Sequence, residues 1–338
     1  MNIRIAPPCC YSAVGQKSNQ EDTLFPFEGN ATTDTKVFIV CDGMGGHENG
    51  EVASACVAET IGSITAQQPL CTTAEMQEAF EKALQETYHQ LDMLDKSESK
   101  RKMGTTLTFL ALCTDAVLVA HIGDSRVYQL RPQQGVLFQT RDHSLVNDLV
   151  AAGELTEEQA KTYPHRNIIT RAIQPHQEYP AKATFNVLTD VQPGDVFFLC
   201  SDGVIEKLED DLSQILLEGL PLKERMEHIQ TECFQRETRD NNTAYLIEIT
   251  EVGDVPVKEN NLSDSSLQEN DTKMKPVTPV GKSYIKWLGW LIVSLIIVAI
   301  AFTAYYLMKP QSSIPTSTTI KKEMIKKTIK KTISKNAN

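Results

Sequence analysis

Residues 37–43 read VFIVCDG and residues 196–203 read VFFLCSDG, and these two stretches hold the only Asp-Gly pairs in the chain. In each, an apolar run long enough for a buried strand ends at the acid. A carboxylate at such a point is held rigidly yet exposed, and the glycine lets the backbone turn so closely that its carbonyl can also face an ion. Asp-Gly is a common turn as well, so either pair alone fits a turn without chemistry. The repeated context favours a functional role.

Strand-like and helical stretches alternate in blocks around these two segments. Helical patterns occur near residues 51–66, 74–95, 144–161 and 212–236. The β-rich runs are KVFIVCD, TTLTFLALC, AVLVAHIGD, RVYQL, GVLFQT, ATFNVL, DVFFLCSD and TAYLIEIT. Several strands follow one another directly, which favours an α+β domain with mostly antiparallel sheets over a regular βαβ winding. We expect one such domain over residues 1–251.

The charge is distributed unevenly along the 338 residues. Residues 1–251 carry 20 basic and 38 acidic side chains, whereas residues 252–338 carry 13 lysines and 6 acids. A body this acidic repels a nucleic-acid backbone, so we expect no nucleic-acid partner. The eight cysteines form no C-x-x-C pair and several lie in apolar runs, which is typical of packed thiols in a reducing compartment.

The C-terminal quarter predicts a membrane anchor. Residues 287–308 hold 22 residues without a charge, with Trp287 and Trp290 at one end and Tyr305 and Tyr306 at the other. This length spans a bilayer and the aromatic residues lie where interfacial belts form, although a buried helix of a soluble core is the alternative. The polar residues 252–286 predict a flexible linker.

Residues 309–338 form a lysine-rich tail that fits either a basic amphipathic helix on an anionic lipid surface or a solvated tail. Its lysine excess would favour a cytoplasmic tail. The N-terminus lacks the apolar stretch of a signal peptide, and moving so large a body across a membrane without one is harder. We therefore expect a single-pass membrane protein with a cytoplasmic body.

Further acids stand at predicted strand ends. Glu21 and Asp22 lie in SNQED, Asp124 follows the run AVLVAHIG, and Asp240 precedes the last strand. Together with Asp42 and Asp202 they form a set of hard oxygen ligands that suits Mg or Mn, and no Cys-His set with zinc spacing competes. Two such ions can activate water and neutralise a phosphoryl group under in-line attack, which is a hydrolase design.

The ordered motifs resemble the metal-dependent type 2C protein serine/threonine phosphatases, of bacterial type, over residues 10–250. The matching pieces are GQKSNQED, CDGMGGHENGEVAS, MGTTLT, HIGDSRVY, RDHSLV, PHRNIITRAI, GDVFFLCSDGV and DNNT. DGMGG together with GDSR and SDG is specific, whereas DNNT or GTT alone is weak. The resemblance implies two packed antiparallel sheets flanked by helices, with a centre of two or three Mn or Mg ions at the strand ends.

The resemblance also implies a reaction, hydrolysis of phosphoserine or phosphothreonine in proteins by metal-activated water, opposed by a serine/threonine kinase. It makes Asp42, Asp202 and Asp240 the catalytic metal ligands. The full implied set is Asp42 bridging two metals, Gly43 as a carbonyl ligand, Asp202 and Asp240 as terminal ligands, Asp124 for a third metal, Glu21 and Asp22 on metal-held waters, and Lys17 for phosphate.

Three positions depart from the family pattern. Lys17 replaces a phosphate-binding Arg and so loses the bidentate fork, Met44 stands where eukaryotic members carry a histidine, and Gln174 stands where glycine often follows TRA-hydrophobic. The histidines lack ligand spacing and are not assigned to the site. Arg126 and Arg171 fit structural salt bridges better than substrate contacts.

Three other functions are weighed against this one. A cysteine phosphatase needs a C-x5-R loop, but the sixth residue after Cys41 is His47 and the sixth after Cys200 is Glu206. A catalytically weak scaffold that binds phosphoproteins is the main alternative, and a hydrolase of small phosphate esters is the other. The complete set of acids favours the protein phosphatase.

Overall fold

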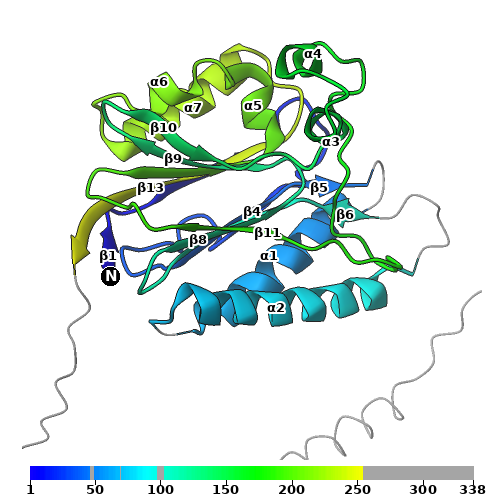
Figure 1. The fold of residues 1–338 in the computed structure, drawn as a ribbon, viewed down its shortest axis with the longest axis horizontal. Coiled ribbons are helices and arrows are strands. Elements are labelled where there is room, and N and C mark those ends of the chain that lie inside the picture. Colours follow the sequence, from blue (N-terminus) through cyan, green and yellow to red (C-terminus); the bar gives the residue numbers. More distant parts are fainter. Residues whose placement is uncertain (46–48, 69, 97–102, 254–338) are drawn as a thin grey trace, which may run out of the picture. The chain divides into compact units, whose positions relative to one another are not determined.

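Two antiparallel β-sheets lie face to face in the computed structural model, with helices on both outer sides (Figure 1). The structure describes residues 1–45, 49–68, 70–96 and 103–253. Every pairing between its named strands is antiparallel. The α+β class with two packed antiparallel sheets, expected from the pattern of strands, is confirmed for these residues.

The first sheet has the order β1-β13-β12-β9-β10, and β2 pairs with the N-terminal half of β13. Its strands are β1 Asn2–Ile5, β2 Cys9–Ala13, β9 Arg126–Arg131, β10 Gly135–Gln139, β12 Val196–Cys200 and β13 Asn242–Gly253. The second sheet has the order β11-β8-β7-β4-β3. Its strands are β3 Thr23–Phe25, β4 Val37–Cys41, β7 Leu107–Leu112, β8 Val117–Ile122 and β11 Thr184–Leu188. A two-stranded ribbon joins β5 Gly43–Met44 to β6 Gly104–Thr105.

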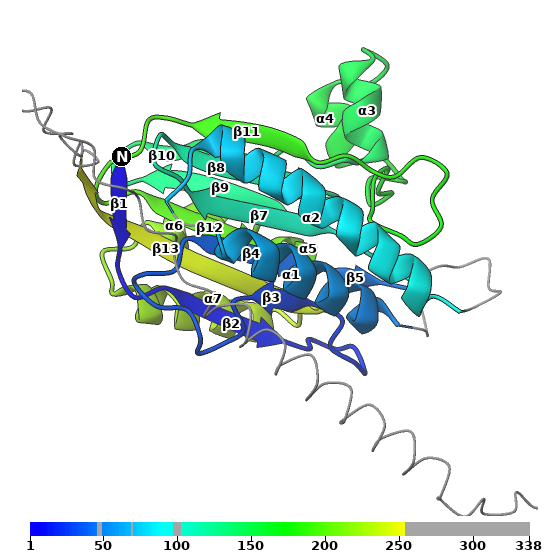
Figure 2. The same cartoon turned by 90° about the horizontal axis from the view of Figure 1, so that it is seen from below.

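Long helices cover the second sheet on its outer face. Helix α1 spans Gly50–Ala66 and α2 spans Thr73–Leu94, and they run side by side beneath β4, β7 and β8 (Figure 2). Helix α2 begins at a capping box, because the Thr72 hydroxyl accepts from the Glu75 N–H while the Glu75 carboxylate accepts from the Thr72 N–H. The start of α2 is therefore fixed by local sequence.

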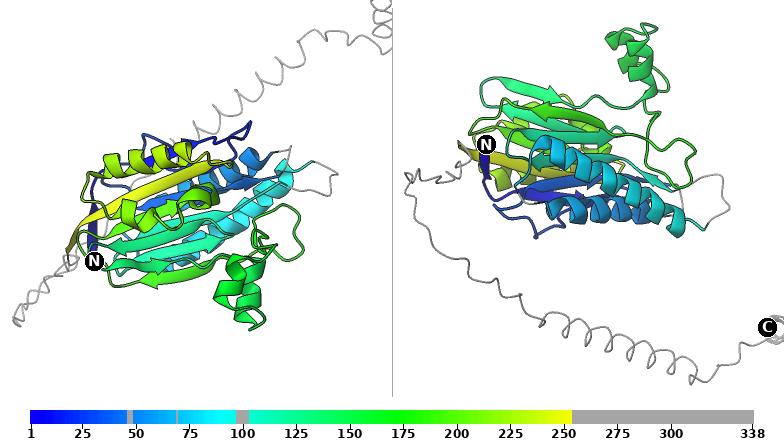
Figure 3. Two further views of the ribbon diagram at one scale, coloured as in Figure 1. Left: turned by 90° about the horizontal axis from the view of Figure 1, so that it is seen from above. Right: turned by 60° about the horizontal axis from the view of Figure 1, so that its bottom comes forward.

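Helices α5 Asp202–Leu208, α6 Leu212–Leu216 and α7 Leu222–Gln235 cover the first sheet (Figure 3, left). Two short helices, α3 Leu145–Ala151 and α4 Glu157–Lys161, project beside the sandwich near one end of the sheets. The described part of the chain is thus layered as helix, sheet, sheet, helix, and each of the three layer boundaries holds its own apolar cluster.

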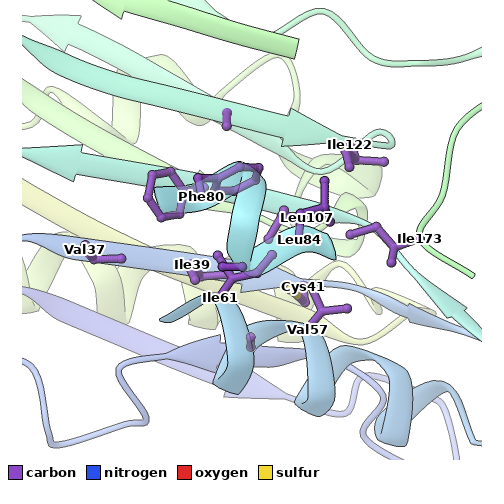
Figure 4. Close-up of a cluster of buried hydrophobic side chains, with 14 of the residues drawn as sticks. Val37, Ile39, Cys41, Val57, Ile61, Phe80, Leu84, Leu107, Ile122 and Ile173 are labelled. Carbon is purple, nitrogen blue, oxygen red and sulfur yellow. The ribbon is translucent and has the colours of Figure 1, made fainter. Parts of the chain in front are cut away.

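The strands β4 and β12 are buried along their whole length, as continuous apolar runs predict. Figure 4 shows Ile39 and Cys41 of β4 directed toward Val57 and Ile61 of α1, in the cluster between sheet and helices. At the sheet-to-sheet boundary, Phe38 packs edge-to-face on Tyr245 with ring centroids 5.2 Å apart. Burial on both faces holds the ends of these two strands rigidly.

The predicted helices at 144–161 and 212–236 are each broken in two. Gly153, at φ 77°, turns the chain between α3 and α4, and Pro221 stands at the N-cap of α7 after the turn that ends α6. The sequence pattern also missed α5 and the short strands β1, β2, β3, β5 and β6. These elements are short and lack the continuous apolar run that marks β4 and β12.

No helix within the described residues is long and apolar enough to cross a membrane. The predicted span at 287–308 lies outside the described residues, as do most of the predicted linker at 252–286 and all of the tail at 309–338. Those boundaries stay predictions.

Candidate metal centre

Five aspartates from distant parts of the chain meet where the strands of both sheets end. Asp42 follows β4, Asp124 lies between β8 and β9, and Asp202 begins α5 directly after β12. Asp22 precedes β3, and Asp240 lies two residues before β13. Each of these carboxyl groups acts electrostatically on another member of the set. The structure therefore brings together the five aspartates among the six acids predicted at strand ends.

The backbone around Asp42 is fixed from the neighbouring strand. The Asp42 N–H donates to Thr106 Oγ1 at 3.1 Å, and the Asp42 carbonyl accepts from the Thr106 N–H and from Thr105 Oγ1, both at 2.9 Å. The next residue, Gly43, donates its N–H to the Glu21 carbonyl at 3.1 Å. These bonds fix the backbone of Asp42 at the end of β4.

Both Asp-Gly glycines are required by close backbone approach, not by a positive φ. A Cβ on Gly43 would lie 2.4 Å from the carbonyl oxygens of Glu21 and Gly50. A Cβ on Gly203 would lie 2.0 Å from the carbonyl oxygen of Asn241. Each glycine thus lets another segment of the site pass directly against the strand end.

Asp22 is the most enclosed acid of the group, with a relative exposure of 6%. Its Oδ2 accepts from Ser201 Oγ at 2.7 Å, and Ser201 Oγ in turn accepts from the Thr243 N–H at 3.0 Å. Asp22 Oδ1 has no hydrogen-bond partner within the described part of the chain. Ser201 therefore orients one oxygen of Asp22 and leaves the other free.

Burial and mutual repulsion raise the pKa of the clustered carboxyl groups. Burial, then Asp202 and Asp240, raise the pKa of Asp22 from 3.8 to about 7. Burial, then Asp202 and Asp142, raise the pKa of Asp124 to about 7 as well. The pKa of Asp42 is raised well above its ordinary value by burial and by Asp22, Asp202 and Asp124, and burial also raises the pKa of Asp202. In the absence of a cation these acids hold protons that they would lack in water.

The cluster fits a divalent cation. Within the described ranges, Asp22, Asp124 and Asp202 each have a buried Oδ1 with no hydrogen-bond partner, which is a costly arrangement unless a cation or water faces the oxygen. No three His, Cys, Asp or Glu side chains in those same ranges form a group that could hold an ion by themselves. Backbone carbonyls such as that of Gly43, together with water, would have to complete the coordination, as is common for Mg.

Among the residues that the structure describes, Lys17 is the only cation that forms an ion pair with an aspartate of this cluster. Its Nζ lies 2.8 Å from Asp240 Oδ1, and both side chains are about half exposed, at 47% and 40%. The hydrogen bond to Asp240 raises the pKa of Lys17, and Glu21 and Asp42 also attract its charge. Glu21 is itself near Lys17, Glu51 and Asp240, with a pKa raised by burial. Both residues therefore lie at the site, and their roles remain predictions.

Neither cysteine beside the acids is built to attack phosphorus. Cys41 and Cys200 are fully buried, and burial raises the pKa of both thiols. A buried thiol with a raised pKa is a packing residue. Arg126 makes a two-pronged pair with Asp142, Nε to Oδ1 and Nη2 to Oδ2, both at 2.8 Å, which confirms its interpretation as a structural salt bridge.

Sequence reasoning assigned no role to the polar residues that orient the acids. Thr106 belongs to the motif GTT, Ser201 to SDG and Asn241 to DNNT. The Asn241 Oδ1 accepts from the Glu21 N–H at 2.8 Å, and its amide donates to the carbonyls of Val14 and Asn19. Their place in these motifs could have marked them as site residues. Their hydrogen-bond partners could not be predicted, because those partners are distant in the sequence.

We expect Mn²⁺ to stabilise the protein more at neutral than at acid pH. The folded, metal-free protein binds more protons at Asp22 and Asp124 than the unfolded chain does, so its stability falls as the pH rises from 3.8 to about 7. A bound cation removes this loss, because it needs the deprotonated acids. The Mn²⁺-induced rise in Tm should therefore be larger at about pH 7.5 than at about pH 5.5, by roughly 2–4 °C or more. Equal rises at both pH values in a calorimetric scan would contradict the charge assignment.

Comparisons with known proteins agree with this geometry. The family model for protein phosphatase 2C matches residues 11–248. The protein phosphatase PhpP of Streptococcus pneumoniae serotype 2 is 32% identical over 240 residues, which cover 70% of this chain and 95% of that protein. The solved serine/threonine phosphatase of S. agalactiae is 32% identical, with a TM-score of 0.63 over 72% of this chain and 99% of the other. The catalytic domain of the phosphatase PstP, solved with two manganese ions, is 27% identical, with a TM-score of 0.58 over 74% of this chain and 100% of the other.

Proposed function

This chain belongs to the protein phosphatase 2C family, in its bacterial form, as a Mn- or Mg-dependent serine/threonine phosphatase, and we propose that the aspartate cluster between its two sheets carries the reaction. The single observation behind this proposal is the convergence of five aspartates from both sheets, three of them with an unpartnered buried oxygen. Phosphorylated serine and threonine side chains of proteins are the substrates.

The residues divide the work as follows. Asp42, Asp202, Asp240 and the Gly43 carbonyl would hold two metal ions, Asp124 a third, and Glu21 and Asp22 would accept hydrogen bonds from waters. When bound, the metals supply water activation and neutralisation of the phosphoryl charge. Thr106 keeps Asp42 in place, and Ser201 keeps Asp22 oriented. The two buried cysteines are unsuited to nucleophilic attack, which agrees with the proposed attack by water without a phosphoenzyme.

We also propose that Lys17 contacts the phosphate group of the substrate. Its ammonium group pairs with Asp240 in the structure, at the exposed rim of the cluster. If Asp240 held a metal ion, Lys17 would be free to contact a phosphate oxygen. A lysine makes this contact as a point charge, where an arginine would make two parallel hydrogen bonds.

The substrate class separates this proposal from its two alternatives. The full chain is assayed with a phosphothreonine peptide and with p-nitrophenyl phosphate, in Mn²⁺ and in chelator. A protein phosphatase turns over the peptide in a metal-dependent way at least as well as the small ester. Binding of the peptide without turnover favours a scaffold, and a strong preference for the small ester favours a metabolite phosphatase.

We expect the chain to be anchored in a membrane by residues 287–308, on the strength of their uncharged length and aromatic ends. The full chain should sediment with membranes and resist extraction by high salt, and the variant lacking residues 287–308 should stay in the supernatant. Continued sedimentation of that variant would contradict the anchor assignment. In the proposed topology the phosphatase domain faces the cytoplasm and opposes a serine/threonine kinase near the membrane.

A further inference from the structure

Two histidines that the proposed reaction does not use lie stacked beside the Asp124 loop. His121 is in β8 and His143 follows β10, and their rings are 4.4 Å apart between centroids and within 7° of parallel. Both are buried, with relative exposures of 2% and 8%. Buried imidazoles need defined hydrogen-bond partners, and these partners identify what the pair holds.

The partners fix the protonation state of both rings. His121 Nε2 lies 2.9 Å from the Arg141 carbonyl, which can only accept, so this nitrogen carries the proton. His143 Nδ1 accepts from the Gly123 N–H at 3.1 Å, so in the neutral ring the proton is on Nε2, which lies 2.9 Å from Thr184 Oγ1 and 3.3 Å from Arg171 Nη1. Burial, then His121 and Arg171, lower the pKa of His143 to about 3. The stacked pair is thus neutral at physiological pH.

His143 is bonded to Gly123 in both directions. Besides the side-chain bond, the His143 N–H donates to the Gly123 carbonyl at 2.9 Å. Gly123 has φ 103°, and a Cβ there would lie 2.6 Å from Thr106 Cγ2. The very next residue is Asp124. The imidazole of His143 therefore fixes the unusual backbone turn that presents Asp124 to the cluster.

The same histidine also closes the base of the segment that carries α3 and α4. Its carbonyl accepts from the Thr170 N–H at 2.8 Å, and the adjacent Ser144 pairs with Ile169 in an isolated β-bridge. The Leu145 N–H donates to the Ile168 carbonyl at 2.9 Å. Residues 145–168, with both short helices, are thus attached to the sandwich next to the Asp124 loop (Figure 3).

We propose that His143 is a positioning residue: through its Nδ1 it holds the Gly123 turn so that Asp124 faces the metal centre, and it joins this turn to the base of the α3–α4 segment. The inference rests on the proposed function for the use of Asp124. It assigns a task to the RDHS motif that is distinct from packing, because one acceptor atom, and not the ring volume, carries the effect.

Two amide substitutions at His143 distinguish the effect of the Nδ1 acceptor from the effect of the ring volume. In His143→Asn the side-chain oxygen can replace Nδ1 toward the Gly123 N–H, whereas in His143→Gln the amide reaches the place of Nε2 and leaves the Gly123 N–H without a partner. The matched control is Thr184→Val, which removes only the hydroxyl at the other end of the ring. Each variant is made in the full chain, and Mn²⁺ binding is followed by titration calorimetry and by the Mn²⁺-induced change in Tm.

We expect His143→Gln to weaken Mn²⁺ binding by about 10-fold or more, as loss of a group that orients a metal ligand does. His143→Asn and Thr184→Val should bind Mn²⁺ within about twofold of wild type, a margin well below that loss. Equal affinities in His143→Asn and His143→Gln, or weaker binding in His143→Asn, would overturn the proposal, since a packing role makes the smaller amide the poorer replacement. Hydrogen exchange gives a second readout that needs no His143 variant. The Gly123 amide should stay protected in wild type and in Thr184→Val, and fast exchange in wild type would overturn the proposed hydrogen bond to His143 Nδ1.

These readouts do not depend on turnover. If the wild-type chain released no phosphate, the proposed function would fail, and the Mn²⁺ titrations would still decide whether His143 positions the Asp124 loop.

Discussion

Replacing Asp42 by asparagine should abolish metal-dependent phosphate release and at the same time stabilise the metal-free protein near neutral pH. Asp42 is a buried carboxyl surrounded by Asp22, Asp124 and Asp202, and this surrounding raises its pKa. An amide keeps the shape and does not titrate, so the free-energy cost of a carboxyl group whose pKa is raised on folding disappears in the metal-free protein. The loss of activity should exceed the roughly 10–100-fold typical of residues that only orient metal ligands.

General damage to the fold would lower both activity and stability, whereas this prediction requires activity to fall and metal-free stability to rise. Activity is measured as phosphate released from a phosphothreonine peptide, and stability as Tm in chelator at about pH 7.5, above the pKa of about 7 that Asp22 and Asp124 reach. Asp115→Asn serves as the control, because Asp115 accepts hydrogen bonds from Thr73 at the start of α2, in another part of the domain. The control should leave activity unchanged. An Asp42→Asn protein that is less stable than wild type in chelator would contradict the described charge cluster.

Substituting Gly203 by alanine should damage both folding and activity, for a purely steric reason. The new Cβ would lie 2.0 Å from the Asn241 carbonyl oxygen, so backbone must move against backbone. Asn241 adjoins Asp240 and accepts the Glu21 N–H, so its displacement moves two predicted site residues together. Forcing extra atoms into a packed site costs about 1–3 kcal/mol and occasionally more, and contact between two main-chain segments belongs at the upper end.

A matched glycine shows whether the position or the residue type matters. Gly219 lies in the turn between α6 and α7, and a Cβ there would meet nothing within 4 Å. Gly219→Ala should change the urea midpoint of unfolding little, whereas Gly203→Ala should lower it clearly and lose phosphate release. A Gly203→Ala protein with wild-type stability and activity would show that the close approach of the two segments is not needed.

The sequence predicts the centre of this fold well because the decisive strands are buried on both faces. The runs ending at Asp42 and Asp202 are continuous apolar strands, and their acids meet as the pattern requires. Antiparallel sheets and the long helices α1 and α2 were likewise predicted. These features depend on local sequence, where hydrophobic periodicity and capping residues act directly.

Other features could not be predicted because they depend on partners distant in the sequence. Ser201 is 179 residues from Asp22, and His143 meets Thr184 from 41 residues away. The ion pair between Lys17 and Asp240 joins the two ends of the domain. Residues 144–161 form two helices because Gly153, with a positive φ, turns the chain between them. A single glycine does not rule out a helix in the sequence pattern, so the break could not be predicted. Pairings of this kind follow from the packed sandwich and not from any single stretch of the chain.

The most direct test of the central claim is release of phosphate from a phosphothreonine peptide by the full chain, measured with Mn²⁺, with Mg²⁺ and with chelator, for wild type and for Asp202→Ala. The account predicts release with either metal, none in chelator, and loss of release in Asp202→Ala. A folded wild-type chain that binds Mn²⁺ and the phosphopeptide but releases no phosphate would contradict it and leave the phosphoprotein-binding scaffold in its place.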